Sequence, residues 1–308
     1  MSNQIIVGSM QVNNGFSGQY YLPYSIGLLC SYIKKHSNKS NDLKFAIPIY
    51  RREEKSNLVK KLEGVDILLV SLYVWNKNIS LAVAKEVKIK NPDILVVIGG
   101  PSVPNDASEF MIEHSYIDLC VHQEGEQTFL EIVDMLPNNN YSDIQGLSYR
   151  DDNGVIHNTG LRDRIRDFSL IPSPYLSGFF DELIEIVGDS HSWLASWESN
   201  RGCPFACTYC DWGSATNSKV TRIELERAFE ELDWFTQHKI EFIFVCDANF
   251  GMLPRDLEIA DYVTTLKQVF GYPKVFSVQN TKNKRERAYG VQKKLADSGL
   301  AKSVTIAL

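Results

Sequence analysis

Short apolar runs alternate with amphipathic stretches along the first 137 residues of the chain. The apolar runs are continuous, as expected for parallel strands that are buried on both faces. They lie at 5–7, 45–47, 67–70, 94–98 and 119–121. Helical patterns lie near 24–35 and 80–90, from about 106, and at 126–136. The pattern predicts an α/β domain with a doubly wound, Rossmann-like parallel sheet of five strands.

A hairpin and a connector are predicted next. Two strand-like segments flank the turn Asp151-Asp152-Asn153-Gly154, so the hairpin either closes the first domain or begins the linker. The stretch 162–178 is charged and then punctuated by prolines, as in an ordered connector. We therefore assign 1–140 to the first domain and 141–190 to the hairpin and linker.

From about residue 193 the alternation resumes and predicts a second run of parallel βα units. Strands are expected at 193–197, 240–245, 275–278 and 303–308, and helices at 222–238, 255–270 and 284–298. Thr221 and Glu224 have the spacing of a capping box, which would start the first of these helices. A fourth strand with no helix after it would leave an edge and a face bare. We therefore expect 191–308 to be the N-terminal part of a barrel, in a chain that continues further.

Composition narrows the class of protein. With 44% hydrophobic residues among 308, the chain can form two ordinary domains, which excludes a fibrous or disordered class. The net charge of −6 and the scattered Lys and Arg residues argue against a nucleic-acid partner. No apolar run is long enough for a membrane span, and no signal-peptide pattern is seen, so we expect a cytoplasmic protein without a membrane partner.

Three of the six cysteines, Cys203, Cys207 and Cys210, stand within eight residues. This distribution is typical of a metal site in a reducing compartment and unlike a disulfide framework. Three thiolates leave one iron of a cubane cluster open to an external ligand. The alternative is a structural zinc loop with a fourth ligand such as Cys246 or His238. Structural zinc usually uses two separated cysteine pairs, and the sequence has no second pair.

The spacing Cys-x-x-x-Cys-x-x-Cys, in a loop after the first strand of a βα barrel, resembles the radical S-adenosylmethionine (SAM) superfamily. The flanking Asn200-Arg201-Gly202 and Asp211-Trp212-Gly213 strengthen the resemblance. It implies a [4Fe-4S] cluster on the three cysteines, with SAM chelated by the open iron and cleaved reductively to a 5′-deoxyadenosyl radical. It also implies a reductant protein such as flavodoxin or ferredoxin.

The resemblance suggests further SAM contacts. Tyr209 matches the family's residue near the adenine, although loop packing explains an aromatic there equally well. After the second strand of this part of the chain, Cys246-Asp247-Ala248-Asn249-Phe250 replaces a Gly-Gly-Glu-like segment. Asp247 and Asn249 could accept hydrogen bonds from the SAM ammonium group, or could cap a turn. Gln279, after the third strand, is a weaker candidate for a ribose or carboxylate contact.

Loops of the first domain form a second candidate site. Gly99-Gly100-Pro101 follows the fourth strand, and its glycines would let a large ligand approach the backbone. Ser71 and Tyr73 follow the third strand and Glu124-Gly125 the fifth, so the three loops share one rim of the sheet. With Leu22-Pro23-Tyr24 before the first helix, this set resembles the cobalamin-binding domain that precedes many radical SAM domains.

The first loop departs from one corrinoid pattern. Many such domains carry Asp-x-His-x-x-Gly, whose histidine coordinates cobalt, but this loop reads Val12-Asn13-Asn14-Gly15-Phe16. The resemblance therefore implies a cobalamin whose lower face has no histidine ligand. Tyr73 or Trp75 could cover that face, or could equally pack in the core.

These resemblances imply a cobalamin-dependent radical SAM enzyme, most simply a methyltransferase acting on an unactivated centre of a small-molecule or peptide substrate. A ring rearrangement or cyclisation with the same cofactors stays open. Methylthiotransferases are disfavoured because they need three further N-terminal cysteines, and only Cys30 and Cys120 are present there. A non-enzymatic alternative is an interaction module with zinc on the cysteine triplet.

Overall fold

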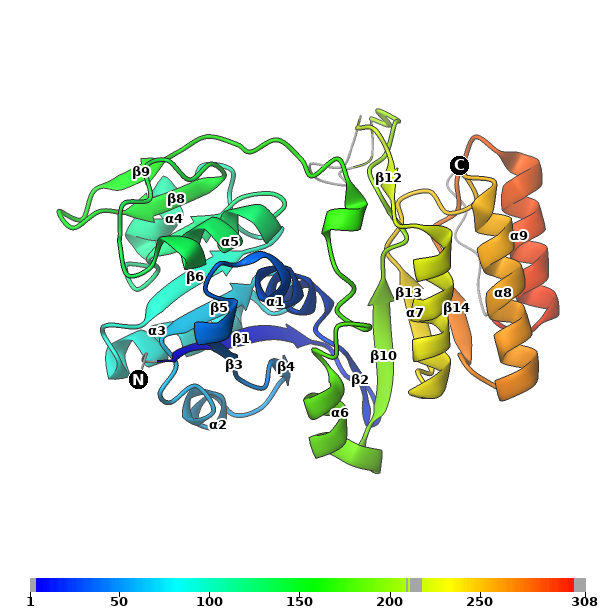
Figure 1. Cartoon of the computed structure of the whole chain (residues 1–308), viewed down its shortest axis with the longest axis horizontal. Helices are drawn as coiled ribbons and strands as arrows, with labels where there is room; N and C mark the ends of the chain where they lie inside the picture. Colours follow the sequence, from blue (N-terminus) through cyan, green and yellow to red (C-terminus); the bar gives the residue numbers. More distant parts are fainter. Residues whose placement is uncertain (1–3, 209, 211–217, 302–308) are drawn as a thin grey trace. The chain divides into compact units, whose positions relative to one another are not determined.

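The computed structural model describes residues 4–208, 210 and 218–301 of the chain. The chain divides into two compact α/β units, each built from several segments (Figure 1). The first unit comprises Met1–Gly15, Ser25–Ile165 and Ser177–Ile186. The second unit comprises Phe16–Tyr24, Arg166–Leu176 and Val187–Leu308.

The first unit is built on a sheet that, over the described residues, has eight strands in the order β3-β1-β5-β6-β7-β8-β9, with β4 also paired to β1. Its parallel strands are β1 (Ile5–Asn13), β3 (Leu43–Phe45), β4 (Ile49–Arg51), β5 (Ile67–Ser71), β6 (Leu95–Gly99) and β7 (Leu119–Val121). The predicted doubly wound parallel sheet is confirmed. The bounds of the second predicted strand, 45–47, are wrong: only its first residue lies in a strand, β3, and β4 begins after Pro48, which lacks a backbone N–H.

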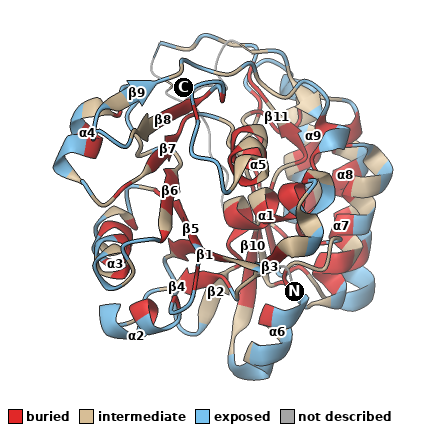
Figure 2. Cartoon of the chain, turned by 60° about the vertical axis from the view of Figure 1, so that its left-hand side comes forward, coloured by how far each residue is buried: buried red, intermediate tan, exposed pale blue. Residues whose placement is uncertain are grey.

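Helices cover both faces of this sheet. They are α1 (Tyr24–His36), α2 (Lys55–Lys60), α3 (Lys77–Lys90), α4 (Ser108–Glu113) and α5 (Glu126–Met135). Buried residues of α2, α3 and α4 share one core cluster, and those of α1 and α5 share another. All five residues of β5 are buried, which explains the continuous apolar run in the sequence (Figure 2).

The predicted hairpin extends the sheet of the first unit. It consists of β8 (Leu147–Arg150) and β9 (Ile156–Asn158), and β8 pairs antiparallel with β7. In its turn, Asp151 Oδ1 accepts hydrogen bonds from the Asn153 and Val155 amides. The hairpin therefore closes the first unit, although the sequence groups it with the linker at 141–190.

The second unit contains a parallel sheet with the order β14-β13-β10-β2 in the described part of the chain. Its strands are β2 (Gln19–Tyr21), β10 (Ser192–Trp197), β13 (Phe242–Val245) and β14 (Val275–Ser277), and its long helices are α7 (Leu225–Gln237), α8 (Arg255–Phe270) and α9 (Arg285–Asp297). These elements confirm the predicted βα units. The strand expected at 303–308 lies outside the described residues.

β2 comes from the part of the chain that the sequence assigns to the first domain, but it belongs to the second unit. It pairs in parallel with β10, with Gln19 opposite Ser192, and the Leu22 amide donates to the Leu194 carbonyl at 2.9 Å. The segment Gln19-Tyr20-Tyr21 has neither an apolar run nor an alternating pattern. Periodicity therefore could not reveal this strand.

The predicted capping box of α7 is wrong. α7 begins at Leu225 after Glu224, and no side chain caps it with a hydrogen bond. Thr221 instead lies in β12 (Thr221–Arg222), which pairs antiparallel with β11 (Asn200–Arg201), and its hydroxyl donates to the Arg201 carbonyl. The β11–β12 ribbon closes the base of the segment that carries the three cysteines.

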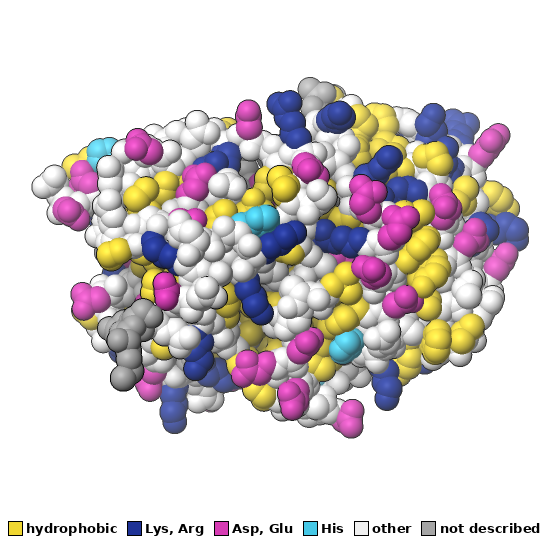
Figure 3. Space-filling model, viewed as in Figure 1, with side chains coloured by type: hydrophobic (Ala, Val, Ile, Leu, Met, Phe, Trp, Pro, Cys, Tyr) yellow, Lys and Arg dark blue, Asp and Glu magenta, His cyan; other side chains and the backbone are white. Residues whose placement is uncertain are grey.

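The remaining elements are short. They are α6 (Asp181–Val187) and the 3₁₀ turns Ser40–Asp42, Phe168–Leu170 and Gly188–Ser190. On the face drawn in Figure 3, Lys and Arg side chains are interspersed with Asp and Glu side chains. Within the described ranges, no helix combines the length and apolar character that a membrane span requires.

Candidate functional site

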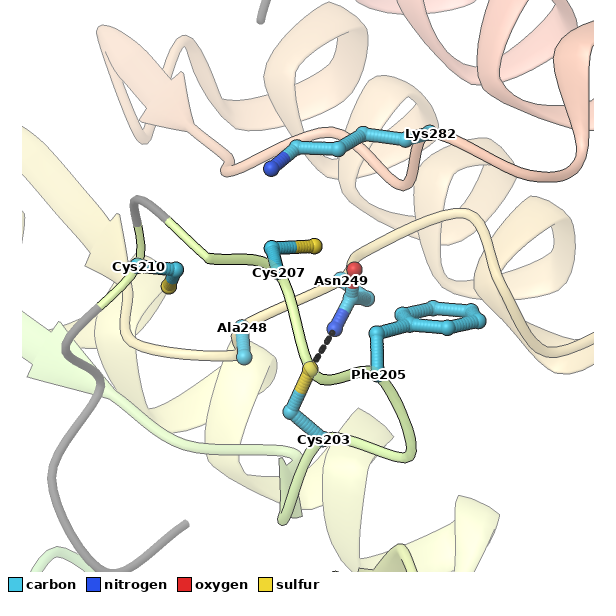
Figure 4. Close-up of a pocket in the computed structure, with 7 residues that line it drawn as sticks. All are labelled: Cys203, Phe205, Cys207, Cys210, Ala248, Asn249 and Lys282. Atoms are coloured by element: carbon cyan, nitrogen blue, oxygen red, sulfur yellow. Dashed lines mark hydrogen bonds between the residues drawn. The ribbon is translucent and has the colours of Figure 1, made fainter. Parts of the chain in front are cut away.

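The three clustered cysteines line one hollow in the second unit (Figure 4). The other residues that line it are Phe205, Ala248, Asn249 and Lys282. They come from the segments that follow β10, β13 and β14 in the chain, with the short β11 between β10 and the cysteines. Because β10, β13 and β14 pair in parallel, the hollow lies at the carboxyl ends of parallel strands, as predicted. The Cys203 thiol is buried, and those of Cys207 and Cys210 are half-buried.

The backbone fixes the start of the cysteine loop. Gly202 has φ +113°, and a Cβ at this position would lie 2.6 Å from the Lys219 carbonyl oxygen, so only glycine fits. The Cys203 carbonyl accepts a hydrogen bond from the Ser218 amide at 2.8 Å, and the Cys203 amide donates to the Ser218 hydroxyl at 3.3 Å. The first cysteine is thereby held in place before any ligand binds.

The donor set fits an iron–sulfur cluster. The three cysteines surround a hollow. In a cubane cluster each cysteine binds a different iron around a shared core, which requires such a space.

Asp247 anchors the cysteine segment and does not line the hollow. Its side chain is fully buried. Oδ1 accepts hydrogen bonds from the Ser199 and Asn200 amides at 2.7 and 3.0 Å, and Oδ2 accepts from the Ser199 hydroxyl and the Asn200 side-chain amide at 2.5 and 2.7 Å. Because a carboxylate has about four acceptor sites, all are taken. Burial raises the pKa of Asp247 to about 7, against the opposing effect of the hydrogen bonds.

The other predicted SAM contacts are distributed differently. Asn249 lines the hollow, and its Nδ2 lies 3.0 Å from the Cys203 sulfur. Gln279 is not among the lining residues, and its carbonyl accepts a hydrogen bond from the Phe250 amide. Tyr209 lies outside the described residues. Of the two residues that the structure describes, Asn249 lies beside the cysteines and Gln279 does not line the hollow.

The residues considered as a fourth zinc ligand do not line the hollow. Cys246 Sγ lies 3.7 Å from the Phe244 carbonyl oxygen, and burial raises the pKa of its thiol. His238 Nδ1 lies 2.8 Å from the Trp234 carbonyl oxygen, and its ring stacks on the Trp234 ring. Both side chains are occupied by local packing in the second unit.

Lys282 and Phe205 line the hollow but were not singled out from the sequence. Phe205 stands between the first two cysteines in the sequence, and whether its ring lines the hollow depends on the loop conformation. Lys282 follows β14, so its position at the carboxyl edge was available from the predicted strand order. Its charge was counted among the scattered Lys and Arg residues of the chain, which were interpreted as solvated surface.

The rim of the first unit is formed as predicted. Strand register places Ser71 opposite Gly99, and Gly99 opposite Val121, at the carboxyl edge of the sheet. Asn76, which was not singled out, is fully buried at this rim. Its Nδ2 donates to the carbonyls of Ser71 and Val12 at 3.0 and 3.1 Å. The side chain therefore holds the loop after β5 against the end of β1.

Tyr73 and Trp75 form a stacked aromatic pair on the loop after β5. Their ring centroids are 4.5 Å apart and nearly parallel, at 16°. The Tyr73 hydroxyl lies 2.9 Å from the Ser25 hydroxyl, and the Trp75 side chain is 44% exposed. A tryptophan exposed to this degree does not pack in the core, so the Trp75 ring lies at the surface of this rim.

Glu124 contacts the connector. Its carboxylate accepts hydrogen bonds from Arg164 Nε and from the Ile165 amide, at 2.8 and 2.9 Å. Gly125 directly precedes α5. Each Glu124 oxygen accepts a hydrogen bond within the protein, and the predicted contact of Glu124 to the cofactor stays a prediction. Gly125 leaves the backbone at the start of α5 without a side chain.

We expect Gly100→Ala to lower the free energy of unfolding of the cofactor-free protein by at least about 2 kcal/mol. Gly100 has φ +108°, and an added Cβ would lie 2.7 Å from the Leu72 carbonyl oxygen, while Pro101 beside it is exposed in the turn. Gly64→Ala is the matched control, because Gly64 has φ +78° with nothing within 4 Å of the added Cβ. Gly64→Ala should lower the free energy of unfolding by about 1 kcal/mol. Urea denaturation measures both, and equal losses would show that the close approach at Gly100 carries no cost.

Three comparisons place the chain among known proteins. The B12 binding domain family matches residues 12–133. The 2-(S-pantetheinyl)-carbapenam-3-carboxylate methyltransferase of Streptantibioticus cattleyicolor is 35% identical over 297 residues, which cover 96% of this chain and 44% of that protein. The cobalamin-dependent radical SAM methyltransferase TokK of Streptomyces tokunonensis is 34% identical over 297 residues, which again cover 96% of this chain and 44% of that protein. This chain therefore spans less than half the length of these relatives.

The fold is also found in a solved structure. The cobalamin-dependent S-adenosylmethionine radical enzyme OxsB, with aqua-cobalamin and S-adenosylmethionine bound, superimposes with a TM-score of 0.68 at 19% identity. The match covers 98% of this chain and 43% of OxsB. The fold of this chain is therefore a known one. The OxsB chain is longer than the segment that matches.

Proposed function

We propose that the complete protein is a cobalamin-dependent radical SAM methyltransferase, because residues 12–133 match the B12 binding domain family and the chain is similar to two methyltransferases, one of them named as cobalamin-dependent and radical SAM. The observation that carries this proposal is the hollow lined by Cys203, Cys207 and Cys210. It lies in a chain whose similarity to two methyltransferases extends over 96% of its length. Ring rearrangement or cyclisation with the same cofactors is the alternative outcome of the test below.

The residues present fit the three cofactors that this function requires. Cys203, Cys207 and Cys210 would hold a [4Fe-4S] cluster, with one iron open to the amino and carboxylate groups of SAM. The loops at Ser71, Gly99 and their neighbours would hold cobalamin at the carboxyl edge of the first sheet. When bound, these groups supply the electron, the radical precursor and the methyl carrier, and the protein supplies position and electrostatics.

We propose roles for several side chains in and near the hollow. The Lys282 ammonium would attract the SAM carboxylate, as a cation matched to an anionic group. Asn249 Oδ1 can accept a hydrogen bond from the SAM ammonium. Tyr209 and Gln279 stay proposed contacts to the adenine and to the ribose or carboxylate. Asp247 acts indirectly, because it fixes the segment that leads into Cys203.

We propose a small molecule as the substrate, with a peptide as the less favoured class. The support is the name of the Streptantibioticus relative, which specifies a carbapenam carboxylate that carries a pantetheinyl group. A low-potential cluster needs an electron donor, so we propose a flavodoxin or ferredoxin as the partner, in the reducing conditions of the cytoplasm.

Anaerobic reconstitution of the complete protein with iron, sulfide and hydroxocobalamin tests the function. We expect about four irons per chain, and 5′-deoxyadenosine after addition of dithionite and SAM. With SAM labelled in its methyl group, label in the corrinoid fraction supports methyl transfer. An unlabelled corrinoid, with 5′-deoxyadenosine still formed, supports the rearrangement or cyclisation. Stoichiometric zinc without iron would instead support a metal-stabilised interaction module.

A further inference from the structure

One hydrogen bond joins the loop after β13 to the first cysteine. Asn249 Nδ2 lies 3.0 Å from Cys203 Sγ, the contact drawn as a dashed line in Figure 4. Asn249 is 5% exposed and Cys203 is 7% exposed. At this burial little water reaches the sulfur to compete with the amide. The low local dielectric also makes the hydrogen bond stronger than it would be in water.

Chemistry determines which end of the amide faces the sulfur. A cysteine bound to iron is a thiolate without a proton, so its sulfur can only accept hydrogen bonds. The Asn249 nitrogen donates and its oxygen does not, so the nitrogen must face Cys203 when a cluster is bound. Figure 4 shows this arrangement, with the amide oxygen directed away from the Cys203 sulfur.

The backbone around Asn249 is held from several sides. The Asn249 carbonyl accepts a hydrogen bond from the Met252 amide at 3.1 Å. The fully buried Asp256 carboxylate accepts from the amides of Gly251 and Leu253 at 2.7 and 2.9 Å. The neighbouring Phe250 amide donates to the Gln279 carbonyl at 2.8 Å. The backbone that carries the donor is therefore fixed in position, as the Cys203 backbone is by the Ser218 contacts.

We propose that Asn249 tunes the cluster, raising its reduction potential through the hydrogen bond to the Cys203 sulfur. The inference rests on the proposed function, because it requires a cluster on Cys203. Reduction adds a negative charge that the ligand sulfurs share, so a donor stabilises the reduced cluster more than the oxidised one. Contact with the SAM ammonium would use the opposite atom of the same amide, so one side chain can serve both purposes.

The test is a redox titration of the reconstituted holoprotein without SAM, monitored by the electron paramagnetic resonance of the reduced cluster. Asn249→Leu keeps the side-chain size and removes the donor, so we expect a midpoint potential more negative than in the wild type at equal iron content. Asn249→Asp places a negative charge beside the sulfur and should shift the midpoint in the same direction. Gln237→Leu is the matched control, because it removes a side-chain amide from an exposed position of the same unit that does not line the hollow. Its midpoint should equal that of the wild type.

The outcomes separate the inference from the function on which it rests. An unchanged midpoint in Asn249→Leu at full iron content would overturn the inference and leave the cluster assignment intact. If both Asn249 variants lose iron, resonance Raman spectra of the wild type reconstituted in H₂O and in D₂O decide the question. A deuterium-dependent shift of the iron–cysteine stretch supports the hydrogen bond, and its absence overturns it. A wild-type protein that holds no iron would overturn both proposals.

Discussion

Replacing Cys207 with alanine is expected to reduce the bound iron from about four per chain to near zero and to abolish 5′-deoxyadenosine formation. Cys207 supplies one of the three thiolates that line the hollow. Without it, two of the four cluster irons would have no protein ligand, so the cluster cannot be retained. Iron and sulfide analysis after anaerobic reconstitution, followed by chromatography of the products formed from SAM, measures both effects.

Cys246→Ala is the matched control for this experiment. Cys246 belongs to the same unit and directly follows β13, but its side chain does not line the hollow. This variant should retain both the iron and the product. A Cys207→Ala protein with the wild-type iron content, or with undiminished product, would refute the cluster assignment and with it the proposed function.

The second large effect is expected from Asp247→Asn. An asparagine accepts hydrogen bonds only at its oxygen, so two of the four donors around Asp247 would face an N–H group instead of an acceptor. Leaving buried donors unpaired should lower the free energy of unfolding by about 3 kcal/mol. Because Ser199 and Asn200 lead into Cys203, the reconstituted iron content should fall as well. Urea denaturation of the cofactor-free protein and iron analysis measure the two losses.

This variant also distinguishes two roles for Asp247. If the carboxylate contacted the SAM ammonium, as the sequence suggested, Asp247→Asn would weaken SAM binding while stability and iron content stayed at wild-type values. Asp261→Asn provides the control, because Asp261 is an exposed residue paired with Lys294. That substitution should change the free energy of unfolding by less than about 0.5 kcal/mol.

Strands buried on both faces were predictable from the sequence. β5 and β7 coincide with the apolar runs at 67–70 and 119–121, because parallel strands between two helical layers have no polar face. Elements stabilised by distant partners were not. β2 has a mixed sequence and exists because β10 pairs with it. Thr221 was assigned to a cap because its partner strand, β11, is not adjacent in the sequence.

In the candidate site, too, the features that are local in the sequence were predictable and the contacts between distant segments were not. The cysteine triplet was predictable because its three ligands lie in one loop, so spacing alone describes them. The role of Asp247 depends on Ser199, which follows β10, and on Asn200, the first residue of β11. Hydrogen bonds between segments that are distant in the sequence leave no mark on spacing. The donor contact of Asn249 to Cys203 was missed for the same reason.

The place of β2 in the second sheet affects how the protein can be synthesised and dissected. The ribosome releases this strand well before β10, its only hydrogen-bonded neighbour among the described strands, so the edge of the second sheet forms after most of the first unit has been translated. Excising residues 191–308 as a separate module would remove β2 and expose the unpaired edge of β10 to other chains. A dissection that retains Phe16–Tyr24 preserves this edge.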